Sequence, residues 1–151
     1  MKLFNGFKLT AISMLACFSG SLMAAEFFLD AGDSQAKGAN SSVVLIGFSG
    51  SADITDSQVF ADYDASAVSV TVKAFGSAGC SNPSPGRVIV TSPDLGGKAL
   101  GEKVGAYCQV TVKSINKGPL SKSPLTLSNA FCSGAAGMQK SCSAGVETAA
   151  K

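Results

Sequence analysis

The sequence predicts an all-β fold, a sandwich of two antiparallel sheets. Apolar and polar residues alternate over several short runs, which is the period of strands with one buried face. Segments rich in Gly, Pro, Asn and Ser separate these runs, and no window keeps a helical period. The 17 glycines follow no period, so they indicate turns rather than a collagen-like or disordered chain.

The first 25 residues have the features of a secretion signal. Lys2 and Lys8 precede an apolar run, and the small residues Ala24 and Ala25 form a cleavage site. The run is too short and too interrupted for a membrane anchor. We therefore expect residues 1–25 to be removed. Residues 26–151 then form one domain that is secreted, periplasmic or on the cell surface, with no membrane insertion after cleavage.

Cys17 leaves a second interpretation of the N-terminus open. In Met14-Leu15-Ala16-Cys17 a small residue directly precedes a cysteine, as in signals for lipid attachment. Leu15 stands where a smaller residue is usual, and the apolar run continues past Cys17. Cleavage after Ala24 or Ala25 is therefore preferred.

The first three strands are predicted from their apolar content. Glu26–Leu29 is short and apolar, which suits an edge strand at the start of the domain. Val43–Phe48 is apolar almost throughout, as expected of a central strand. Val59–Tyr63 follows as the third strand.

The later strands are predicted from alternation. In Ala67–Phe75 the valines at 68, 70 and 72 face one way and polar residues face the other. Arg87–Thr91 follows a segment rich in Pro and Gly, and Tyr107–Lys113 alternates again. A short strand is expected at Leu125–Leu127, and a last one near Val146.

Turn-rich segments join these strands, and one segment could hold a single helical turn, Ala99–Val104. The predicted turns are Gly47–Ser51, Gly76–Gly86, Asp94–Gly97, Asn116–Pro124 and Ser133–Gly137.

Four cysteines follow the signal, and an even number in an exported chain indicates two disulfides. Three connectivities are open. A segment rich in Ser, Gly and Ala separates Cys132 from Cys142, which favours a local bond between them. Cys80, in a loop, would then pair with Cys108, on a strand. A zinc site is disfavoured, because the chain has no Cys-x-x-Cys pair and no His.

Charge and composition exclude several functions. Without Lys2 and Lys8 the basic and acidic residues balance, and no basic patch suggests binding to nucleic acid. An enzyme is not expected, because no His is available as base or metal ligand. The Ser-Lys arrangement Ser121-Lys122-Ser123 lies in a Pro-flanked loop, where a nucleophile and base would not be held rigidly.

The ordered strands resemble those of cohesin-like domains. The matching segments, in the family's order, are Ala39–Phe48, Asp53–Asp64 with its Tyr-Asp ending, Ala67–Val70, Pro85–Val90 with its Gly-x-Val, Cys108–Val112, and Pro124–Ala130 with its Pro-Leu-x-Leu, ahead of a turn at Gly134–Gly137. The resemblance spans about residues 39 to 146. The two disulfides are not a general feature of that family.

The resemblance implies a jelly-roll sandwich related to carbohydrate-binding modules. It also implies an exported, non-catalytic binding or adhesion module. Its partner would be a protein, such as a dockerin-like module, or a polysaccharide. A polysaccharide is the weaker expectation, because sugar recognition usually relies on exposed aromatic rings and the chain has no Trp.

A binding face is predicted on the polar side of two strands. Thr71 and Lys73 lie outward on one strand, and Gln109, Thr111 and Lys113 lie outward on another. The plain alternative is an ordinary solvated face of a sheet.

Two further functions remain alternatives. The first is a pilin-like or coat subunit that assembles by strand exchange, which requires an exposed terminal strand that can be donated. Glu26–Leu29 is short for that role. The second is a small secreted enzyme, disfavoured above.

Four acids are the best candidates for a cation site. Asp53 and Asp56 are expected in a loop, and Asp62 and Asp64 at the end of a strand. Calcium takes several oxygen ligands that converge from such loops. The alternative is that these acids only solubilise turns.

Calcium binding predicts a melting temperature that rises on addition of calcium and falls again with a chelator, because a ligand that binds the folded state stabilises it. Thermal unfolding in both conditions is the measurement. A melting temperature unaffected by chelator would remove calcium as a cofactor.

Overall fold

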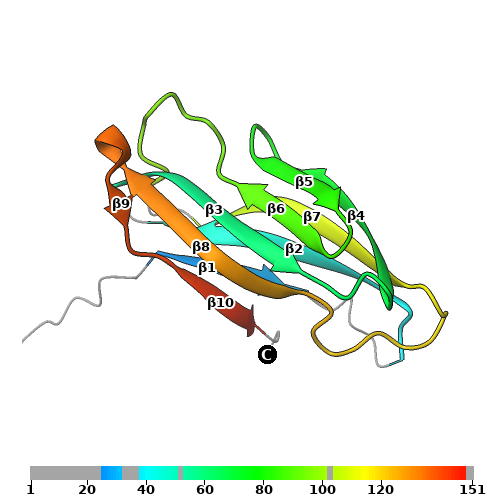
Figure 1. Cartoon of the computed structure of the whole chain (residues 1–151). Coiled ribbons are helices and arrows are strands. Elements are labelled where there is room, and N and C mark those ends of the chain that lie inside the picture. Colours follow the sequence, from blue (N-terminus) through cyan, green and yellow to red (C-terminus); the bar gives the residue numbers. More distant parts are fainter. Residues whose placement is uncertain (1–24, 32–37, 51–52, 102–103, 149–151) are drawn as a thin grey trace, which may run out of the picture.

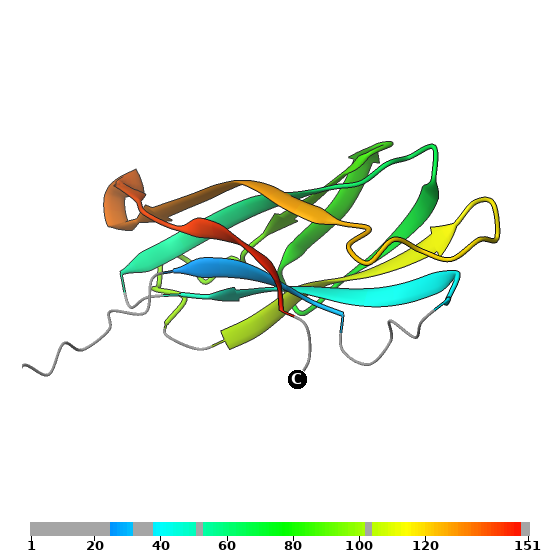
Figure 2. The same cartoon turned by 90° about the horizontal axis from the view of Figure 1, so that it is seen from below.

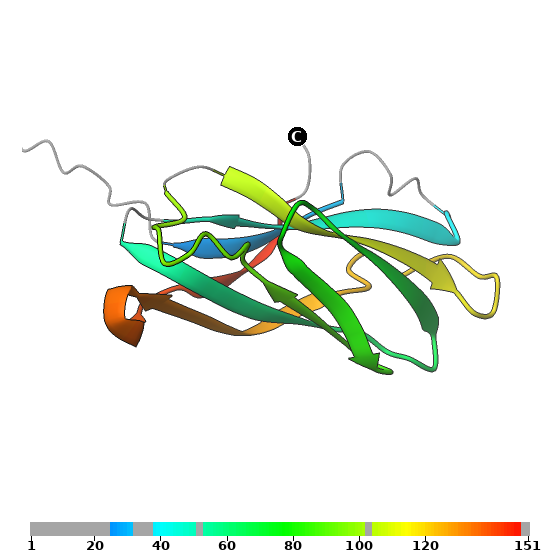
Figure 3. The same ribbon diagram turned by 90° about the horizontal axis from the view of Figure 1, so that it is seen from above.

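The computed structural model of the chain describes residues 25–31, 38–50, 53–101 and 104–148. They form two stacked five-stranded sheets, seen as two layers in Figures 2 and 3. The predictions of a signal peptide and of lipid attachment at Cys17 concern residues outside these ranges, apart from Ala25. Within them, no helix is long and apolar enough to cross a membrane.

The strands fall into sheet A, with the order β10-β1-β2-β7-β4, and sheet B, with the order β5-β6-β3-β8-β9 (Figure 1). Neighbouring strands are antiparallel except β1 and β10, which run parallel. The strands are β1 (Glu26–Asp30), β2 (Ser41–Ser49), β3 (Ile54–Asp62), β4 (Val68–Ala74), β5 (Gly79–Ser84), β6 (Arg87–Thr91), β7 (Val104–Ser114), β8 (Thr126–Gly134), β9 (Gln139–Lys140) and β10 (Ser143–Thr148).

The all-β sandwich predicted from alternation is confirmed. β2 is the central strand of sheet A, and β6 has the predicted bounds. β4 lies within the predicted run Ala67–Phe75, and β7 contains the predicted run Tyr107–Lys113. On β4 the side chains of Val68, Val70 and Val72 are buried or half-buried, whereas Ser69 and Thr71 are exposed. A strand also forms around residue 146, within β10.

The prediction that the segment Glu26–Leu29 is an edge strand is wrong. β1 is held between β2 and β10, because the last strand of the domain pairs alongside the first. Its inward residues Phe27 and Leu29 are buried. A strand paired along both edges has no free backbone groups to offer a neighbouring subunit. The pilin-like alternative therefore loses the terminal strand that it requires.

The turn predicted at Gly76–Gly86 is wrong in its centre, where β5 forms, and Cys80 consequently lies on a strand. β5 is an edge strand with mostly exposed side chains, so it needs no apolar alternation. Its pairing with β6, such as Cys80 opposite Val90, holds it in place. Pro83 is tolerated because an edge strand has one side without ladder hydrogen bonds.

The strand predicted at Leu125–Leu127 is much longer, because β8 continues to Gly134. Asn129 has a positive φ of 50°, and the register with β3 shifts beside it. This bulge breaks the alternation that a sequence pattern would reveal. The chain then makes a single 3₁₀ turn, η2 (Ala135–Gly137), and returns as β9. At Ala99–Val104 no helical turn forms in the described residues, and β7 begins at Val104.

The core lies between the sheets and is built from the inward side chains of both. Phe27 and Phe48 pack with ring centroids 4.7 Å apart, and Tyr107 stacks on Phe48 at 6.1 Å. The largest fully buried side chains are Phe27, Phe48, Ile46, Ile54, Leu125, Val44, Val59, Val88, Val90, Val110, Val112 and Cys108. Burial of these side chains from both sheets stabilises the fold, so the outward residues can be polar.

Two disulfides join the sheets on opposite sides of the sandwich, with the predicted pairing. Cys80 on β5 of sheet B bonds Cys108 on β7 of sheet A, with Cα atoms 5.6 Å apart. Cys132 on β8 of sheet B bonds Cys142, directly before β10 of sheet A, with Cα atoms 6.0 Å apart. The local bond predicted between Cys132 and Cys142 is therefore also a bond between the two sheets.

Removal of each disulfide should show that the two bonds contribute unequally to the free energy of unfolding. The enclosed separations are 28 residues for Cys80–Cys108 and 10 residues for Cys132–Cys142. Loop-closure entropy then predicts losses of about 3.6 kcal/mol for the C80S/C108S variant and about 2.7 kcal/mol for C132S/C142S. Urea unfolding of both double variants measures the free energy of unfolding. A larger loss in C132S/C142S would contradict the entropic explanation.

Candidate binding faces

The structure brings the five residues of the predicted binding face together on the outer surface of sheet A. In the ladder of β4 with β7, Thr71 lies opposite Thr111 and Lys73 opposite Gln109. Lys113 follows on the same side of β7. Lys73 and Lys113 are exposed, whereas Gln109 and Thr111 are half-buried. The five side chains therefore share one face of sheet A, and their role in binding stays a prediction.

Two apolar side chains of β2 extend this face. Val43 lies opposite Thr111 and is 37% exposed, and Leu45 lies opposite Gln109. Beyond Leu45 the ring of Phe28 on β1 covers Gly47, where a Cβ atom would also lie only 2.8 Å from the carbonyl oxygen of Gly105. The outer surface of sheet A is therefore flat, with a polar side on β4 and β7 and an apolar side on β1 and β2.

The four acids predicted as calcium ligands lie at the two ends of β3. Asp56 is within β3 and not in a loop, because Ile54 already begins the strand. At about 3.3 Å per residue, Asp56 and Asp62 are about 20 Å apart. One calcium ion cannot be held by all four carboxylates. In the described part of the chain no three Cys, Asp or Glu side chains are grouped to hold a metal ion.

Each of these acids has a different contact. Asp53 forms an ion pair with Lys140, with Oδ2 2.7 Å from Nζ. Asp56 accepts a hydrogen bond from the Thr55 hydroxyl at 2.9 Å. Asp64 accepts hydrogen bonds from the backbone N–H and the hydroxyl of Ser66, at 2.9 and 2.6 Å. These bonds lower the pKa of the Asp64 carboxyl below its ordinary value.

Sheet B presents a second candidate face that the sequence did not reveal. We use the name sheet B face for the outward residues Phe60, Asp62, Arg87, Ile89 and Phe131. Across the sheet, Arg87 lies opposite Asp62 and Ile89 lies opposite Phe60, on neighbouring strands β6 and β3. Phe131 on β8 lies opposite Gln58 on β3, and 47% of its surface is exposed.

Arg87 is held in place by two different contacts. Its Nε donates to Asp62 Oδ1 at 2.6 Å, and its guanidinium lies 4.7 Å from the centre of the Phe60 ring. Asp62 also accepts a hydrogen bond from the Ser128 hydroxyl. An Arg fixed by an ion pair and an aromatic ring loses little rotamer freedom on binding, and 44% of the Arg87 side chain is still exposed.

The ion pair changes both titrations. The hydrogen bond from Arg87 is the main cause that lowers the pKa of the Asp62 carboxyl; partial burial opposes it, and the Ser128 hydroxyl adds to it. The same contact with Asp62 raises the pKa of Arg87. The pair therefore stays charged throughout the neutral range.

These features support recognition rather than a reaction. An exposed aromatic ring and an ordered Arg on one face are typical of the centres of protein interfaces. A signal for this face was present in the sequence. Phe60 alternates with the inward Val59 and Ala61, and therefore lies on the same side as Gln58 and Asp62.

Comparison with known proteins gives similarity in structure alone. No protein-family model matches the sequence, and no curated protein matches it. The Coh-OlpC–Doc435 complex of Clostridium thermocellum, a type I cohesin–dockerin complex, is similar with a TM-score of 0.61 and 13% identity. The match covers 83% of this chain and 95% of that one.

Two further cohesins are similar over comparable lengths. The sixth cohesin of scaffoldin B from Acetivibrio cellulolyticus, solved with the Cel5 dockerin, has a TM-score of 0.56 and 14% identity, and the match covers 82% of this chain and 98% of that one. A non-cellulosomal cohesin from Archaeoglobus fulgidus has a TM-score of 0.54 and 15% identity, with coverage of 80% and 86%. The fold is therefore a cohesin-like jelly-roll sandwich, as the sequence resemblance implied.

The Arg87–Asp62 pair predicts a specific titration. The lowered pKa of Asp62 means that its contribution to stability is present above the unfolded value, 3.8, and is lost as the pH falls through the lower folded value. In the variant Arg87→Gln the pKa of Asp62 should rise toward 3.8. Carboxyl-carbon NMR titration measures this pKa directly.

Asp64 is the internal control for this titration, because its pKa depends on Ser66 and not on Arg87. The pKa of Asp64 should not change in Arg87→Gln and should rise in Ser66→Ala. An unchanged pKa of Asp62 in Arg87→Gln would show that the ion pair does not hold in solution.

Proposed function

We propose that this chain is an exported, non-catalytic protein-binding module that takes a dockerin-like protein as its partner. Its sandwich is similar to those of cohesins solved in complex with dockerins. Disulfides across both sides of the sandwich suit an oxidising compartment such as the periplasm, the cell surface or the medium. The absence of His from the whole chain counts against acid–base catalysis.

The observation that carries this proposal is the sheet B face. Phe131 is a large aromatic side chain, 47% exposed, on a strand in the interior of a sheet. The same face carries Arg87, which an acid and a ring already orient, about four residues further along β3. Such a surface can bury an aromatic anchor and offer charged hydrogen bonds to a partner without reorganising first.

A polysaccharide fits this surface less well. The chain has no Trp, and the Phe60 ring already carries the Arg87 guanidinium on one side, which leaves Phe131 as the one exposed ring of the sheet B face. Stacking on a sugar needs a free, flat ring. The polar face of sheet A remains the second surface on which a protein could bind, and the two faces are separable by mutation.

The test is capture of secreted proteins of the host by the immobilised module, run beside insoluble polysaccharides. A captured protein is then produced pure, and its Kd is measured by calorimetry. Phe131→Ala and Arg87→Ala should weaken binding by about 30-fold each, the effect of losing a central anchor of about 2 kcal/mol. The matched controls Thr71→Ala and Thr111→Ala on sheet A should leave the Kd unchanged.

Other outcomes have clear meanings. A loss of affinity in the sheet A variants alone would move the binding surface to sheet A. Retention on a polysaccharide, with no protein captured by the wild-type module, would contradict protein binding. The melting temperature of each of the four variants is measured as well, so that a loss of affinity is not mistaken for unfolding of the variant.

A further inference from the structure

Strand β4 is an outer edge of sheet A with no strand beyond it (Figure 1). Its seven residues pair with β7 in one continuous register. Backbone hydrogen bonds of 3.0 Å extend this register at both ends, from Ile115 N to Ala67 O and from Phe75 N to Tyr107 O. Since hydrogen-bonded positions alternate in an antiparallel pair, the odd-numbered residues of β4 direct their backbone groups toward β7.

The even-numbered residues of β4 direct their backbone groups away from the sheet. The N–H of Val68 agrees with this pattern, because it donates to the Asp64 carbonyl in the preceding turn. The N–H and C=O groups of Val70, Val72 and Ala74 also point outward. No backbone hydrogen bond joins them to another residue of the described ranges. Such a row of donors and acceptors is complementary to the backbone of another extended polypeptide.

The other outer edges are less suited to pairing. β5 contains Pro83, and its register with β6 shifts between Ser81 and Ser84. β9 has only two residues, and the register of β10 with β1 is irregular. Among the described strands β4 is thus the regular, unprotected edge, and its one charge is Lys73.

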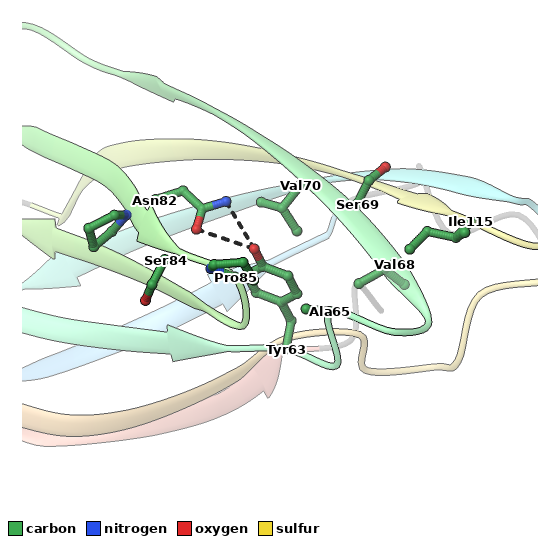
Figure 4. Close-up of a pocket in the computed structure, with 10 residues that line it drawn as sticks. Tyr63, Ala65, Val68, Ser69, Val70, Asn82, Ser84, Pro85 and Ile115 are labelled. Carbon is green, nitrogen blue, oxygen red and sulfur yellow. Dashed lines mark hydrogen bonds between the residues drawn. The ribbon is translucent and has the colours of Figure 1, made fainter.

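A pocket of about 370 Å³ opens beside the first half of β4, between this edge and the end of β5 (Figure 4). Val68 and Val70 form one wall with Ile115, which is 51% exposed. Tyr63 and Pro85 form the opposite wall. The volume is sufficient for one large apolar side chain.

Hydrogen bonds make the second wall rigid. The Asn82 amide satisfies its neighbours when its oxygen accepts from the Tyr63 hydroxyl at 2.9 Å and its nitrogen donates to the carbonyls of Ser84 and Arg87, at 2.7 and 2.9 Å. Tyr63 N also donates to Gly86 O at 3.0 Å. The pocket is therefore formed before any ligand arrives, which reduces the entropy lost on binding.

Charge adds a preference. No carboxylate lines the pocket, and Lys73 and Lys113 are exposed on the outer face of β4 and β7. A strand added at this edge would place alternate side chains on the same face as Lys73 of β4 and, one strand further in, Lys113 of β7. Acidic residues at those positions are favoured.

We propose that the free edge of β4 and its pocket bind an extended peptide segment of a partner protein, which adds to sheet A as a further strand with an apolar side chain in the pocket and acidic side chains toward Lys73 and Lys113. This site is separate from the sheet B face and does not depend on it. A second copy of this chain fits less well, because its own β4 would bring Lys73 and no acidic residue to this edge.

The experiment pans a phage-displayed library of random heptapeptides against the disulfide-bonded protein. Enriched peptides should combine an apolar residue with acidic residues at alternate positions. One peptide is then synthesised in two forms, with backbone N-methyl groups either at the residues whose N–H groups face β4 or at the residues between them. The first form should bind at least tenfold more weakly, and the second should bind as the unmodified peptide does.

Variants of the protein supply the matched test. Val70→Pro removes an outward N–H, whereas Val70→Ala removes the side chain and keeps that N–H. Binding should be at least tenfold weaker in Val70→Pro than in Val70→Ala. Since Pro is tolerated on edge strands, both variants should fold, and the N-methyl peptides test the same bonds on unaltered protein.

Three results would overturn the proposal. The first is a library that yields no enriched peptide. The second is equal affinity of both N-methyl forms. The third is a dimer in size-exclusion chromatography that Val70→Pro abolishes, because the edge would then belong to a second copy of this chain.

Discussion

The packing of two sheets against each other, with a disulfide on each side, is the constraint on which the rest of this structure depends. The inward side chains of β2, β3, β6 and β7 include Ile46, Val59, Val90 and Val110, and each of these is 0% exposed. Burial of this apolar surface supplies the driving force. Cys80–Cys108 and Cys132–Cys142 then oppose the sliding or opening of the layers. Rigid outer faces are the result.

Because the interior is apolar and continuous, any function must lie on these outer faces or along their edges. The two faces differ in chemistry. Sheet A carries hydroxyls, an amide and two lysines beside Val43 and Leu45, whereas sheet B carries an exposed Phe131 and an Arg87 already ordered by Asp62 and Phe60. The second kind of surface loses less entropy when it binds a partner, which is why it carries the proposed function.

The sequence predicted the strands in which burial alternates, and it failed where burial does not. The strands β4, β6 and β7 were predicted correctly because each has one face in the core. The strand β5 was missed, because the sequence of this edge strand, with Asn82 and Pro83, resembles that of a turn, and only its pairing with β6 shows it to be a strand. β8 was cut short by the bulge at Asn129. The cysteine pairing was predicted correctly, although the sequence could not tell that both bonds join the two sheets.

The candidate sites show the same division. The sequence by itself determined the all-β fold and the polar side of β4 and β7, and it favoured the observed pairing of the cysteines, because alternation and local spacing are properties of neighbouring residues. Only the tertiary structure decided that β1 is enclosed, that the four acids lie at two ends of β3, and that Phe60, Arg87 and Phe131 share one face. Those features depend on the register between strands far apart in the chain, which is set by how the two sheets bury their inner faces together.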